Sequence, residues 1–545
     1  MFKRVFLLLA LAATVALPFL LRPRQPTATD ADDTLVLITP HNEAIRHEFE
    51  VGFQHWYRAR TGRSVFLDWR VVGGTSDIIR YLDGEYTAAF RNYWTGRLGH
   101  PWSTEVQSGF KNSKLPATAP EEIRAARTAF LHSKVSCGID LFYGGGNYEF
   151  VNQANAGTLV DSGLLKLHPE WFTEAVMPRF HDGEEYWDSQ GLWFGTVVSS
   201  YGILFNRDSL RRLGFHSEPN QWTDLADARF RGEIALCDPT KSGSIAAAFE
   251  EVIQQQMQRR LTELRRIDPA GEPKVLERQA VREGWITGIR LLQLIGANAR
   301  YFTDTSQKPA IDVGAGDCAA GMCIDFYGRE EADAVFRRTG TDRLGYVSPP
   351  GGSAYSVDPI GLLRGAPHAA VGAAFIEFAL SLEGQKLWNF LPGTPDGPQA
   401  YALRRLPVRR DFYDHTEWRS FRSDPDVNPY AAGEGMVYHS EWTGALFGEI
   451  GFITRVMVQD THPELVKAWA AIAAAPEPAR TAALKILQDV SAVDYEAAFA
   501  MVKPALHSKN QADEVRLARD LGDHFRLQYL RAEAAARAGG LRDAR

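Results

Sequence analysis

A short apolar run that passes through a polar turn into a helix start is the feature that most constrains the fold. In residues 230–249, FRGEIALCDPTKSGSIAAAF, the apolar run 233–237 ends at an Asp-Pro pair and predicts a buried strand. Ser242, Gly243 and Ser244 then precede an alanine-rich run suited to a helix. The unpaired N–H groups of a helix start bind anions, although an ordinary serine cap accounts for the same residues.

The same order of strand, polar turn and helix recurs earlier in the chain. The apolar runs 35–38 and 65–69 are each followed by polar or glycine-rich residues and then by a helical pattern. This alternation predicts a largely parallel sheet covered by helices, in which ligands collect at the carboxyl ends of the strands. The candidate ligand residues in these turns are His41, Asn42, Gly74, Thr75 and Ser76, with simple helix capping as the alternative.

Three further segments place polar groups at the ends of predicted strands. Residues 137–143 run into a triple-glycine turn, 202–206 follow a pair of serines and a tyrosine, and 322–326 end in an acidic and aromatic stretch. The candidate ligand residues here are Gly145, Ser199, Ser200, Tyr201, Asp325 and Tyr327, with core or hinge packing as the alternative.

Composition and motifs exclude several classes of function. With 545 residues, two or three compact units are expected, and 45% hydrophobic and 23% charged residues are typical of a soluble globular protein. The net charge of -7 argues against a nucleic-acid partner. GxSxG, HExxH, Walker A and GxGxxG motifs do not occur in the sequence, so we expect no cofactor and no enzyme. An exported enzyme and a ligand-sensing module remain as alternatives of another class.

The N-terminus has the charge order of an export signal. Lys3 and Arg4 precede the apolar run 5–21, and a polar linker follows. Residues 1–33 are therefore predicted to be a signal peptide or membrane anchor plus linker, because the run is of intermediate length for either role. The rest of the chain is expected in the periplasm or another extracytoplasmic space, free or tethered to the inner membrane.

Four cysteines leave the redox state open. Cys137, Cys237, Cys318 and Cys323 allow three pairings in an oxidising compartment, while small buried thiols are the other interpretation. The spacing of the last two fits neither a CxxC redox motif nor a zinc knuckle.

Four motifs together resemble a known family, the extracytoplasmic solute-binding proteins of ABC importers. They are similar to the type II branch, which includes iron(III), spermidine/putrescine and sugar-phosphate binders. The resemblance covers residues 34–406, and this chain departs from it by insertions near 84–133 and 250–297 and by a long tail. The motifs are 193–195 with 202–206, 222–225 with 230–235, 238–244, and 375–381 with 383–385.

The resemblance implies an α/β fold with two lobes that close on a solute like a clamshell, carrying helical insertions and a helical C-terminal extension. It implies crossings near 196–202 and 345–350. The expected units are lobe 1 (34–195 and 346–400), lobe 2 (196–345) and a mainly helical extension (401–545). The expected partners are a small molecule or ion and an ABC permease, with the protein itself a monomer.

The solute class follows from the residue types in the turns. Glycine- and hydroxyl-lined helix starts suit phosphate or carboxylate, so an anionic organic solute such as a sugar phosphate is favoured. Iron(III) or an iron chelate is the alternative, with His41, Tyr201 and Tyr327 as ligands. The iron-binding relatives have adjacent tyrosines, and no such pair occurs in this sequence.

Overall fold

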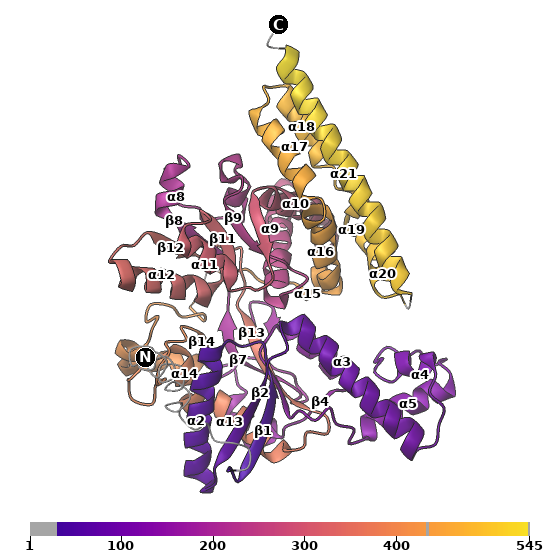
Figure 1. The fold of residues 1–545 in the computed structure, drawn as a ribbon, viewed down its shortest axis with the longest axis vertical. Coiled ribbons are helices and arrows are strands. Elements are labelled where there is room, and N and C mark those ends of the chain that lie inside the picture. The colour runs from indigo at the N-terminus through magenta and orange to yellow at the C-terminus, as the bar shows by residue number, and fades with distance from the viewer. Residues whose placement is uncertain (1–29, 432–434, 509, 543–545) are drawn as a thin grey trace, which may run out of the picture.

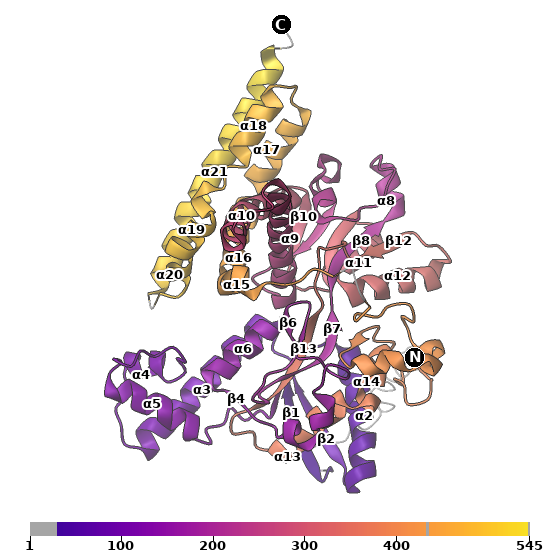
Figure 2. The same cartoon turned by 180° about the vertical axis from the view of Figure 1, so that it is seen from behind.

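The computed structural model describes residues 30–431, 435–508 and 510–542. Residues 1–29 of the predicted signal or anchor segment lie outside the described residues. Within the described ranges, no helix is both long and apolar enough to cross a membrane. Figures 1 and 2 show two α/β bodies, one above the other, with an arm of C-terminal helices along the upper one. The predicted two-lobed α/β architecture is confirmed.

Lobe 1 is the lower body in Figure 1 and is built on a seven-stranded mixed sheet. Its strand order is β14-β7-β13-β3-β1-β2, with β4 paired to β13. β1 pairs in parallel with β2 and β3, whereas β13 is antiparallel to β3 and β7. The strands are β1 (Asp33–Ile38), β2 (Val65–Arg70), β3 (Leu141–Tyr143), β4 (Leu159–Val160), β7 (Phe194–Ser199), β13 (Ser356–Leu363) and β14 (Leu406–Pro407).

Helices cover this sheet by burying apolar stripes. In α2, Ile45, Phe49 and Phe53 recur at helical spacing and are buried. Residues 369–389 form two helices, because Ser381 ends the first and caps the second through its hydroxyl, which accepts from the Gly384 N–H. The helices of this lobe are α2 (Glu43–Thr61), α3 (Thr75–Asn92), α6 (Asn147–Ala156), α7 (Leu164–Leu167), α13 (Ala369–Leu380) and α14 (Leu382–Asn389).

The predicted insertion near 84–133 forms a helical excursion at the side of lobe 1 (Figure 1). It contains α4 (Thr104–Gly109) and α5 (Glu121–His132), and a π-helical turn Tyr93–Arg97 ends α3. Phe90, Phe110 and Phe130 pack against one another, with ring centroids 4.7 to 5.4 Å apart, and join this excursion to the lobe.

Lobe 2 is built on a five-stranded sheet in the order β10-β9-β11-β8-β12. β9 is parallel to β10 and β11, while β8 is antiparallel to β11 and β12. The strands are β8 (Tyr201–Asn206), β9 (Ile234–Cys237), β10 (Ala299–Thr303), β11 (Ala320–Ile324) and β12 (Leu344–Val347). The helices are α8 (Arg207–Arg212), α9 (Gly243–Ile267), α10 (Pro273–Ala297), α11 (Lys308–Ala315) and α12 (Asp325–Thr339).

The chain passes between the lobes twice. Ser200 separates β7 of lobe 1 from β8 of lobe 2, and residues 348–355 connect β12 to β13. The sheets run slightly past the expected lobe limits of 195 and 345, since β7 ends at Ser199 and β12 at Val347. The hairpin of β5 (Phe180–His181) and β6 (Glu184–Glu185) lies beside these crossings (Figure 2).

Residues after 400 do not form one separate unit. Those up to 430 belong to lobe 1, because β14 pairs with β7 and Tyr430 joins the lobe 1 core. The helices from 440 onward share the core of lobe 2 with α9 and α10. They are α15 (Ser440–Thr443), α16 (Phe447–Thr454), α17 (His462–Ala474), α18 (Ala479–Leu487), α19 (Tyr495–Ala497), α20 (Lys503–Leu506) and α21 (Gln511–Arg542).

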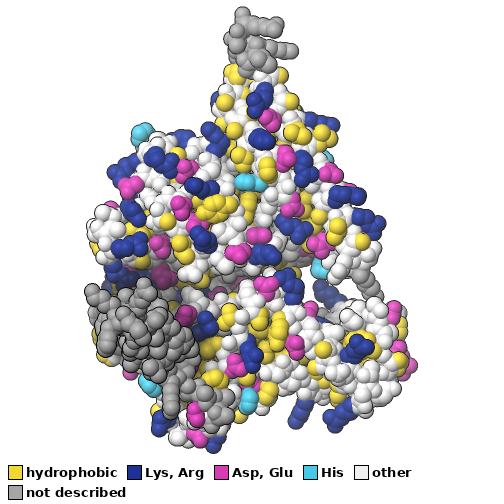
Figure 3. Space-filling view, in the orientation of Figure 1, with side chains coloured by type: hydrophobic (Ala, Val, Ile, Leu, Met, Phe, Trp, Pro, Cys, Tyr) yellow, Lys and Arg dark blue, Asp and Glu magenta, His cyan; other side chains and the backbone are white. Residues whose placement is uncertain are grey.

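The cysteines and surface charges complete the description. Cys137, Cys237, Cys318 and Cys323 are all buried free thiols, and none of the three pairings considered from the sequence is formed. On the face shown in Figure 3, charges of both signs are interspersed over both lobes and the helical arm.

Candidate functional site

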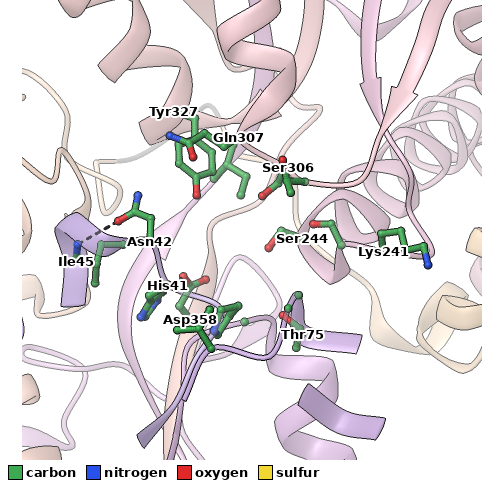
Figure 4. A pocket seen from close by; sticks show the side chains of 18 of the residues that line it. His41, Asn42, Ile45, Thr75, Lys241, Ser244, Ser306, Gln307, Tyr327 and Asp358 are labelled. Atoms are coloured by element: carbon green, nitrogen blue, oxygen red, sulfur yellow. Dashed lines mark hydrogen bonds and ion pairs between the residues drawn. The ribbon is translucent and has the colours of Figure 1, made fainter. Parts of the chain in front are cut away.

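A cavity of about 510 Å³ lies between the two lobes. Lobe 1 contributes the turns after β1 and β2, the glycine turn after β3, and single residues of β13 and of the segment before β14. Lobe 2 contributes the turns after β9, β10 and β11. In Figure 4, residues from both lobes surround the open space.

Five helices of the described chain begin at this cavity. Their N-cap residues all line it: Asn42 for α2, Gly74 for α3, Ser242 for α9, Gln307 for α11 and Ile324 for α12. Because each helix start carries unpaired N–H groups and a partial positive charge, these five helix starts favour anions and oxygen-rich groups.

Helix capping fixes the polar side chains of the lobe 1 turns. The Asn42 side-chain oxygen accepts from the Ile45 N–H at 3.0 Å, as the dashed line in Figure 4 shows, so its amide N–H₂ group can donate to a solute. At the start of α3, the Asp77 carboxylate accepts from the Gly74 N–H at 3.2 Å. Asp77 is also ion-paired with Arg80, and these two contacts occupy its charge.

The glycine turn after β3 packs against two residues of the lobe 1 wall. Gly144 and Gly145 have φ angles of 89° and 107°, a region that residues with a Cβ avoid. A Cβ on Gly144 would lie 2.5 Å from His41 Nε2, and one on Gly145 would lie 2.8 Å from Thr75 Cγ2. The turn therefore packs directly against His41 and Thr75.

Arg405 places a buried positive charge at the lobe 1 wall. Its side chain is 1% exposed, and Nη2 donates to Asp358 Oδ2 and to Ser199 Oγ, each at 2.7 Å. The guanidinium also lies over the ring of Phe326 from lobe 2, 4.2 Å from the centroid. The preceding residue, Arg404, has a φ of 52°, which is unusual for a residue with a side chain and points to a local constraint.

His41 and Asp358 form the rest of this charged group. His41 Nε2 lies 3.6 Å from Asp358 Oδ2, and both His41 ring nitrogens are buried without a hydrogen-bond partner among the described residues. Burial lowers the pKa of His41 despite the nearby carboxylate, which keeps the ring neutral near pH 7. Burial would raise the pKa of Asp358, but Arg405 and His41 hold it below its ordinary value.

The lobe 2 wall consists mainly of neutral hydrogen-bonding groups. The Ser242 hydroxyl caps α9 by accepting from the Ile245 N–H at 3.4 Å, while Ser244 lies one position inside the helix start. Lys241 and Asp304 are the exposed charges of this wall. The other polar residues of this wall are Thr305, Ser306, Gln307 and Tyr327.

The structure brings together eight of the fourteen residues predicted from the sequence. The eight that line the cavity are His41, Asn42, Gly74, Thr75, Gly145, Ser242, Ser244 and Tyr327. Those that do not line it are Ser76, Ser199, Ser200, Tyr201, Gly243 and Asp325.

The hydroxyls predicted at the first crossing bond to the second crossing instead of facing the cavity. Ser200 Oγ lies 3.1 Å from Ser348 Oγ, and the Tyr201 hydroxyl lies 3.4 Å from Ser356 Oγ. Ser199 Oγ accepts from Arg405, so it supports a cavity residue from behind. These contacts tie the two crossings together.

Three other predicted residues are held by neighbours outside the cavity. Asp325 does not end a strand as predicted, because it is the first residue of α12, buried and ion-paired with Arg329 at 2.9 Å. Burial raises the pKa of Asp325 although Arg329 opposes that shift. Gly243 faces Glu149 of lobe 1, and Ser76 lines a small separate pocket that also contains Glu149.

Several cavity residues were missed in the sequence. A signal existed for the turn after β10, where Asp304, Thr305 and Ser306 precede Pro309 in the first turn of α11. Lys241 also lay next to the serine turn already singled out. For Asp358 and Arg405 no local pattern marks a ligand residue, since their position depends on strand pairing.

The two lobes touch beside the cavity. A Cβ on Gly74 of lobe 1 would lie 2.7 Å from the Lys241 carbonyl oxygen of lobe 2. Nearby, the rings of Tyr148 on α6 and Phe447 on α16 are stacked with centroids 4.4 Å apart.

Comparison with known proteins identifies the domain. Residues 138–399 match the family described as bacterial extracellular solute-binding protein. An uncharacterized protein of Haemophilus influenzae is 24% identical over 249 residues, 46% of this chain and 60% of that protein. The phosphoglycerate transport regulatory protein PgtC of Salmonella typhimurium is 24% identical over 218 residues, 38% of this chain and 46% of PgtC. The chain thus spans about half the length of these curated relatives.

Solved structures of periplasmic and ferric ion-binding proteins are similar to this chain at low sequence identity. The periplasmic binding protein AfuA from Actinobacillus pleuropneumoniae, with exogenous fructose-6-phosphate bound, has a TM-score of 0.46 at 15% identity, covering 81% of this chain and 98% of AfuA. Apo ferric ion-binding protein A of Pasteurella haemolytica has a TM-score of 0.47 at 11% identity, covering 77% and 96%. The family match confirms, over residues 138–399, the resemblance inferred from the sequence: this stretch is similar to the bacterial extracellular solute-binding proteins.

Proposed function

We propose that the protein binds a small anionic, hydroxyl-rich solute, such as a sugar phosphate, in the cavity between its lobes. The solute is then delivered to the permease of an ABC importer. The observation that carries this proposal is the convergence of five helix N-termini from both lobes on a cavity that Arg405 also lines. In this role the protein acts outside the cytoplasmic membrane as a monomer, free or tethered by its N-terminal segment.

The distribution of charge favours a sugar phosphate over a bare anion or a cation. Asp358 and Asp77 are paired with Arg405 and Arg80, so their carboxylates do not offer free charge to a polyamine. Hydroxyl and amide side chains line the lobe 2 wall, together with the exposed carboxylate of Asp304. These groups suit sugar hydroxyls, whereas the helix starts and Arg405 suit a phosphate.

Iron(III) or its chelate is the second candidate and has weaker support. Of the three ligands considered, His41 and Tyr327 line the cavity, but the Tyr201 hydroxyl is directed to Ser356 at the crossing. Burial raises the pKa of Tyr327 to about 12, which disfavours the phenolate that iron requires. Among the described residues, no group of three or more His, Cys, Asp or Glu side chains is placed to hold a metal ion.

Ligand sensing is a further candidate because of one relative. PgtC is described as a regulatory protein of phosphoglycerate transport, and it shares 24% identity with this chain over 218 residues. In this role the closed lobes would dock on a membrane receptor instead of a permease. Genes for a permease and an ATPase beside this gene favour import, and a receptor-kinase gene favours sensing.

Thermal shift against sugar phosphates, inorganic phosphate, ferric citrate and spermidine tests the solute class. A solute that binds only the folded state raises the free energy of unfolding by mass action, by about 2.7 kcal/mol at a hundredfold excess over Kd. The melting temperature rises as a result. We expect a response to sugar phosphates that disappears when Ser242 and Ser244 are both replaced by leucine, while the apo variant still melts cooperatively. An unchanged response would place the site elsewhere.

The iron candidate has its own test. If ferric citrate gives a coloured complex, Tyr327→Phe should abolish the phenolate-to-iron absorption band. Colour that persists in this variant argues against Tyr327 as an iron ligand.

A further inference from the structure

Three buried carboxylates lie beside the crossings, and we call Glu184, Glu250 and Glu251 the hinge carboxylates. Glu184 belongs to β6 of lobe 1 and is 7% exposed, whereas Glu250 and Glu251 belong to α9 of lobe 2 and are each 2% exposed. The Ala354 N–H of the second crossing donates to Glu251 Oε1 at 3.2 Å. The Tyr438 hydroxyl, on the segment that leads to the C-terminal helices, donates to Glu250 Oε1 at 3.0 Å.

The hinge carboxylates are surrounded by neutral and acidic groups. Glu184 Oε2 accepts from Asn147 Nδ2 at 2.6 Å, and Glu250 Oε1 also accepts from Thr443 Oγ1 at 2.6 Å. Glu251 Oε2 is buried without a hydrogen-bond partner among the described residues. The titratable groups that face them from the packed elements are Tyr201 on β8, Tyr186 and Asp182 near the β5–β6 hairpin, and Tyr438.

A fourth carboxylate, Glu149, lies where the lobes touch beside the cavity. It projects from α6 of lobe 1 toward α9 of lobe 2, and a Cβ on Gly243 would lie 3.2 Å from its Oε1. Its Oε2 is buried without a partner among the described residues. Tyr148 on the same helix and Glu449 on α16 are the titratable groups nearby, and the cation before α9, Lys241, is exposed.

Burial of their carboxyl oxygens near the contacts between the lobes makes these groups weak acids. It raises the pKa of Glu149 and of Glu250 to about 7, and it raises the pKa of Glu184 to about 8 with Glu250 adding to the effect. Burial also raises the pKa of Glu251 well above its ordinary value. Because Glu149 and Glu184 face lobe 2 from lobe 1, separating the lobes would hydrate them and return their pKa toward the ordinary 4.5.

We propose that closure of the cleft is coupled to proton uptake: the lobes close on protonated Glu149 and hinge carboxylates, and ionisation of these groups opens them. The coupling regulates the site of the proposed function, since a solute held between the lobes is then bound together with protons. Charge repulsion between Glu184 and Glu250 across the lobe interface drives the opening when both are ionised.

The direction of the pH dependence follows from the pKa shifts. The closed form has the higher pKa and therefore binds more protons between the ordinary carboxyl pKa and about pH 8. Across that window the closed population increases as the pH falls, by at most about tenfold per pH unit for each proton. Below the ordinary carboxyl pKa it levels off.

Distance measurements between spin labels on the full chain test this coupling without any solute. Arg91→Cys on α3 and Arg338→Cys on α12 place nitroxides at exposed positions of the two lobes. The native cysteines are buried, so the label attaches to the introduced thiols. From pH 8.5 to 5.5 we expect the ratio of short to long distances to rise at least about fivefold. A ratio that does not change with pH overturns the proposal.

Isosteric substitutions identify the groups responsible. Glu149→Gln combined with Glu184→Gln should keep the short distance dominant at pH 8.5 and reduce the pH response to less than about a third of the parent response. The matched control, Glu85→Gln with Glu122→Gln, removes two exposed carboxylates of the same lobe and should retain the parent response. A double variant that responds like the parent overturns the assignment. Should the double variant fail to melt cooperatively, Glu149→Gln alone carries the same comparison with a smaller effect.

A second measurement separates this coupling from the identity of the solute. Titration calorimetry at pH 7, with the sugar phosphate that gives the largest thermal shift, is repeated in two buffers of different ionisation enthalpy. We expect net proton uptake on binding, and binding with no uptake overturns the coupling while the proposed function stands. If none of the sugar phosphates binds, the proposed function fails, and the spin-label distances still decide the coupling.

Discussion

The two walls of the cavity present polar groups in different ways. On the lobe 1 wall, the ion pair of Asp358 with the buried Arg405 lies beside the neutral, buried ring of His41. On the lobe 2 wall, Ser244 and Ser306 present neutral hydroxyls near helix starts, and the charge of Lys241 is exposed. One wall is therefore fixed and charged, whereas the other is adaptable and mostly neutral.

This difference predicts that the two walls contribute unequally to the affinity for anions. A buried guanidinium held by Asp358 and Ser199 is already oriented before the solute arrives, so little free energy is spent on ordering it. Hydroxyl groups rotate to suit either a donor or an acceptor, and they meet the solute when the lobes close. We expect substitutions on the lobe 1 wall to change the affinity for anions strongly, and substitutions on the lobe 2 wall to change it mildly.

The largest effect is expected from Arg405→Met. This variant removes the charge-assisted hydrogen bond to the anion and leaves Asp358 without its partner. We expect anion binding to weaken by roughly 2–5 kcal/mol, at least about 30-fold, and the free energy of unfolding to fall by about 3 kcal/mol. Calorimetry with a sugar phosphate and chemical denaturation measure the two effects.

A buried arginine that does not line the cavity provides the control. Arg409 is 7% exposed, pairs with Asp411 at 2.6 Å and lies over Trp171. Arg409→Met should lower stability while leaving the affinity of the folded protein unchanged. If both variants weaken binding equally, the effect of Arg405 is structural and the contrast between the walls is lost.

The next largest effect, with the opposite sign, is expected from Asp358→Asn. The amide can still accept from Arg405 but no longer neutralises it, so the positive charge is more available to the solute. We expect anion binding to tighten by about five- to tenfold, or roughly 1 kcal/mol or more. Unchanged or weaker binding in the calorimeter would show that the carboxylate orients Arg405 more than it screens it.

The turns of the cavity could be predicted because their signals are local. Ser242, Gly74 and Asn42 each follow an apolar strand and precede a helical pattern, and all three cap helices at the cavity. Alternation of strands and helices brings such turns to one edge of a sheet, whatever the details of the core. The local order of residues was sufficient for this part of the site.

The charged group of lobe 1 could not be predicted because it is assembled over long separations in sequence. Arg405 is 47 residues from Asp358 and 206 residues from Ser199, and it reaches them through a two-residue pairing of β14 with β7. A strand of two residues has no periodicity to recognise. The predicted extension 401–545 also separates Arg405 from lobe 1, to which it belongs.

The errors at Asp325 and Tyr201 have related causes. α12 begins directly after β11 with no connecting turn, and Asp325 stands between apolar residues, so the sequence predicts it as part of the strand. Hydroxyl groups at the start of β8 resemble ligand groups, but a crossing buries both faces of the chain, and Tyr201 bonds to the neighbouring crossing. Residue type alone does not tell which side of the hinge a side chain faces.

A smaller effect is expected from Ser244→Ala on the lobe 2 wall. Loss of one neutral hydrogen bond should weaken sugar-phosphate binding by about 0.5–1.5 kcal/mol, or roughly three- to tenfold, with stability unchanged. Ser242→Ala is the matched comparison, because its hydroxyl caps α9, and it should lower the free energy of unfolding by about 1 kcal/mol. If Ser244→Ala weakens binding as strongly as Arg405→Met, the contrast between the walls is wrong.

The smallest effect at physiological salt is expected from Lys241→Gln, which also distinguishes an exposed cation from a buried one. Lys241 is exposed, so mobile ions screen its attraction for the solute over a Debye length of about 8 Å at 0.15 M salt. We expect an affinity loss of about two- to threefold at that salt concentration and a larger loss in dilute buffer. The effect should appear mainly in the association rate measured by stopped flow, since an exposed charge attracts the anion before contact. The loss caused by Arg405→Met should depend much less on salt, because the Arg405 side chain is only 1% exposed and mobile ions screen a buried charge less. An equal salt dependence for the two variants would mean that mobile ions screen both cations alike. The contrast between a buried cation on one wall and an exposed cation on the other would then be wrong.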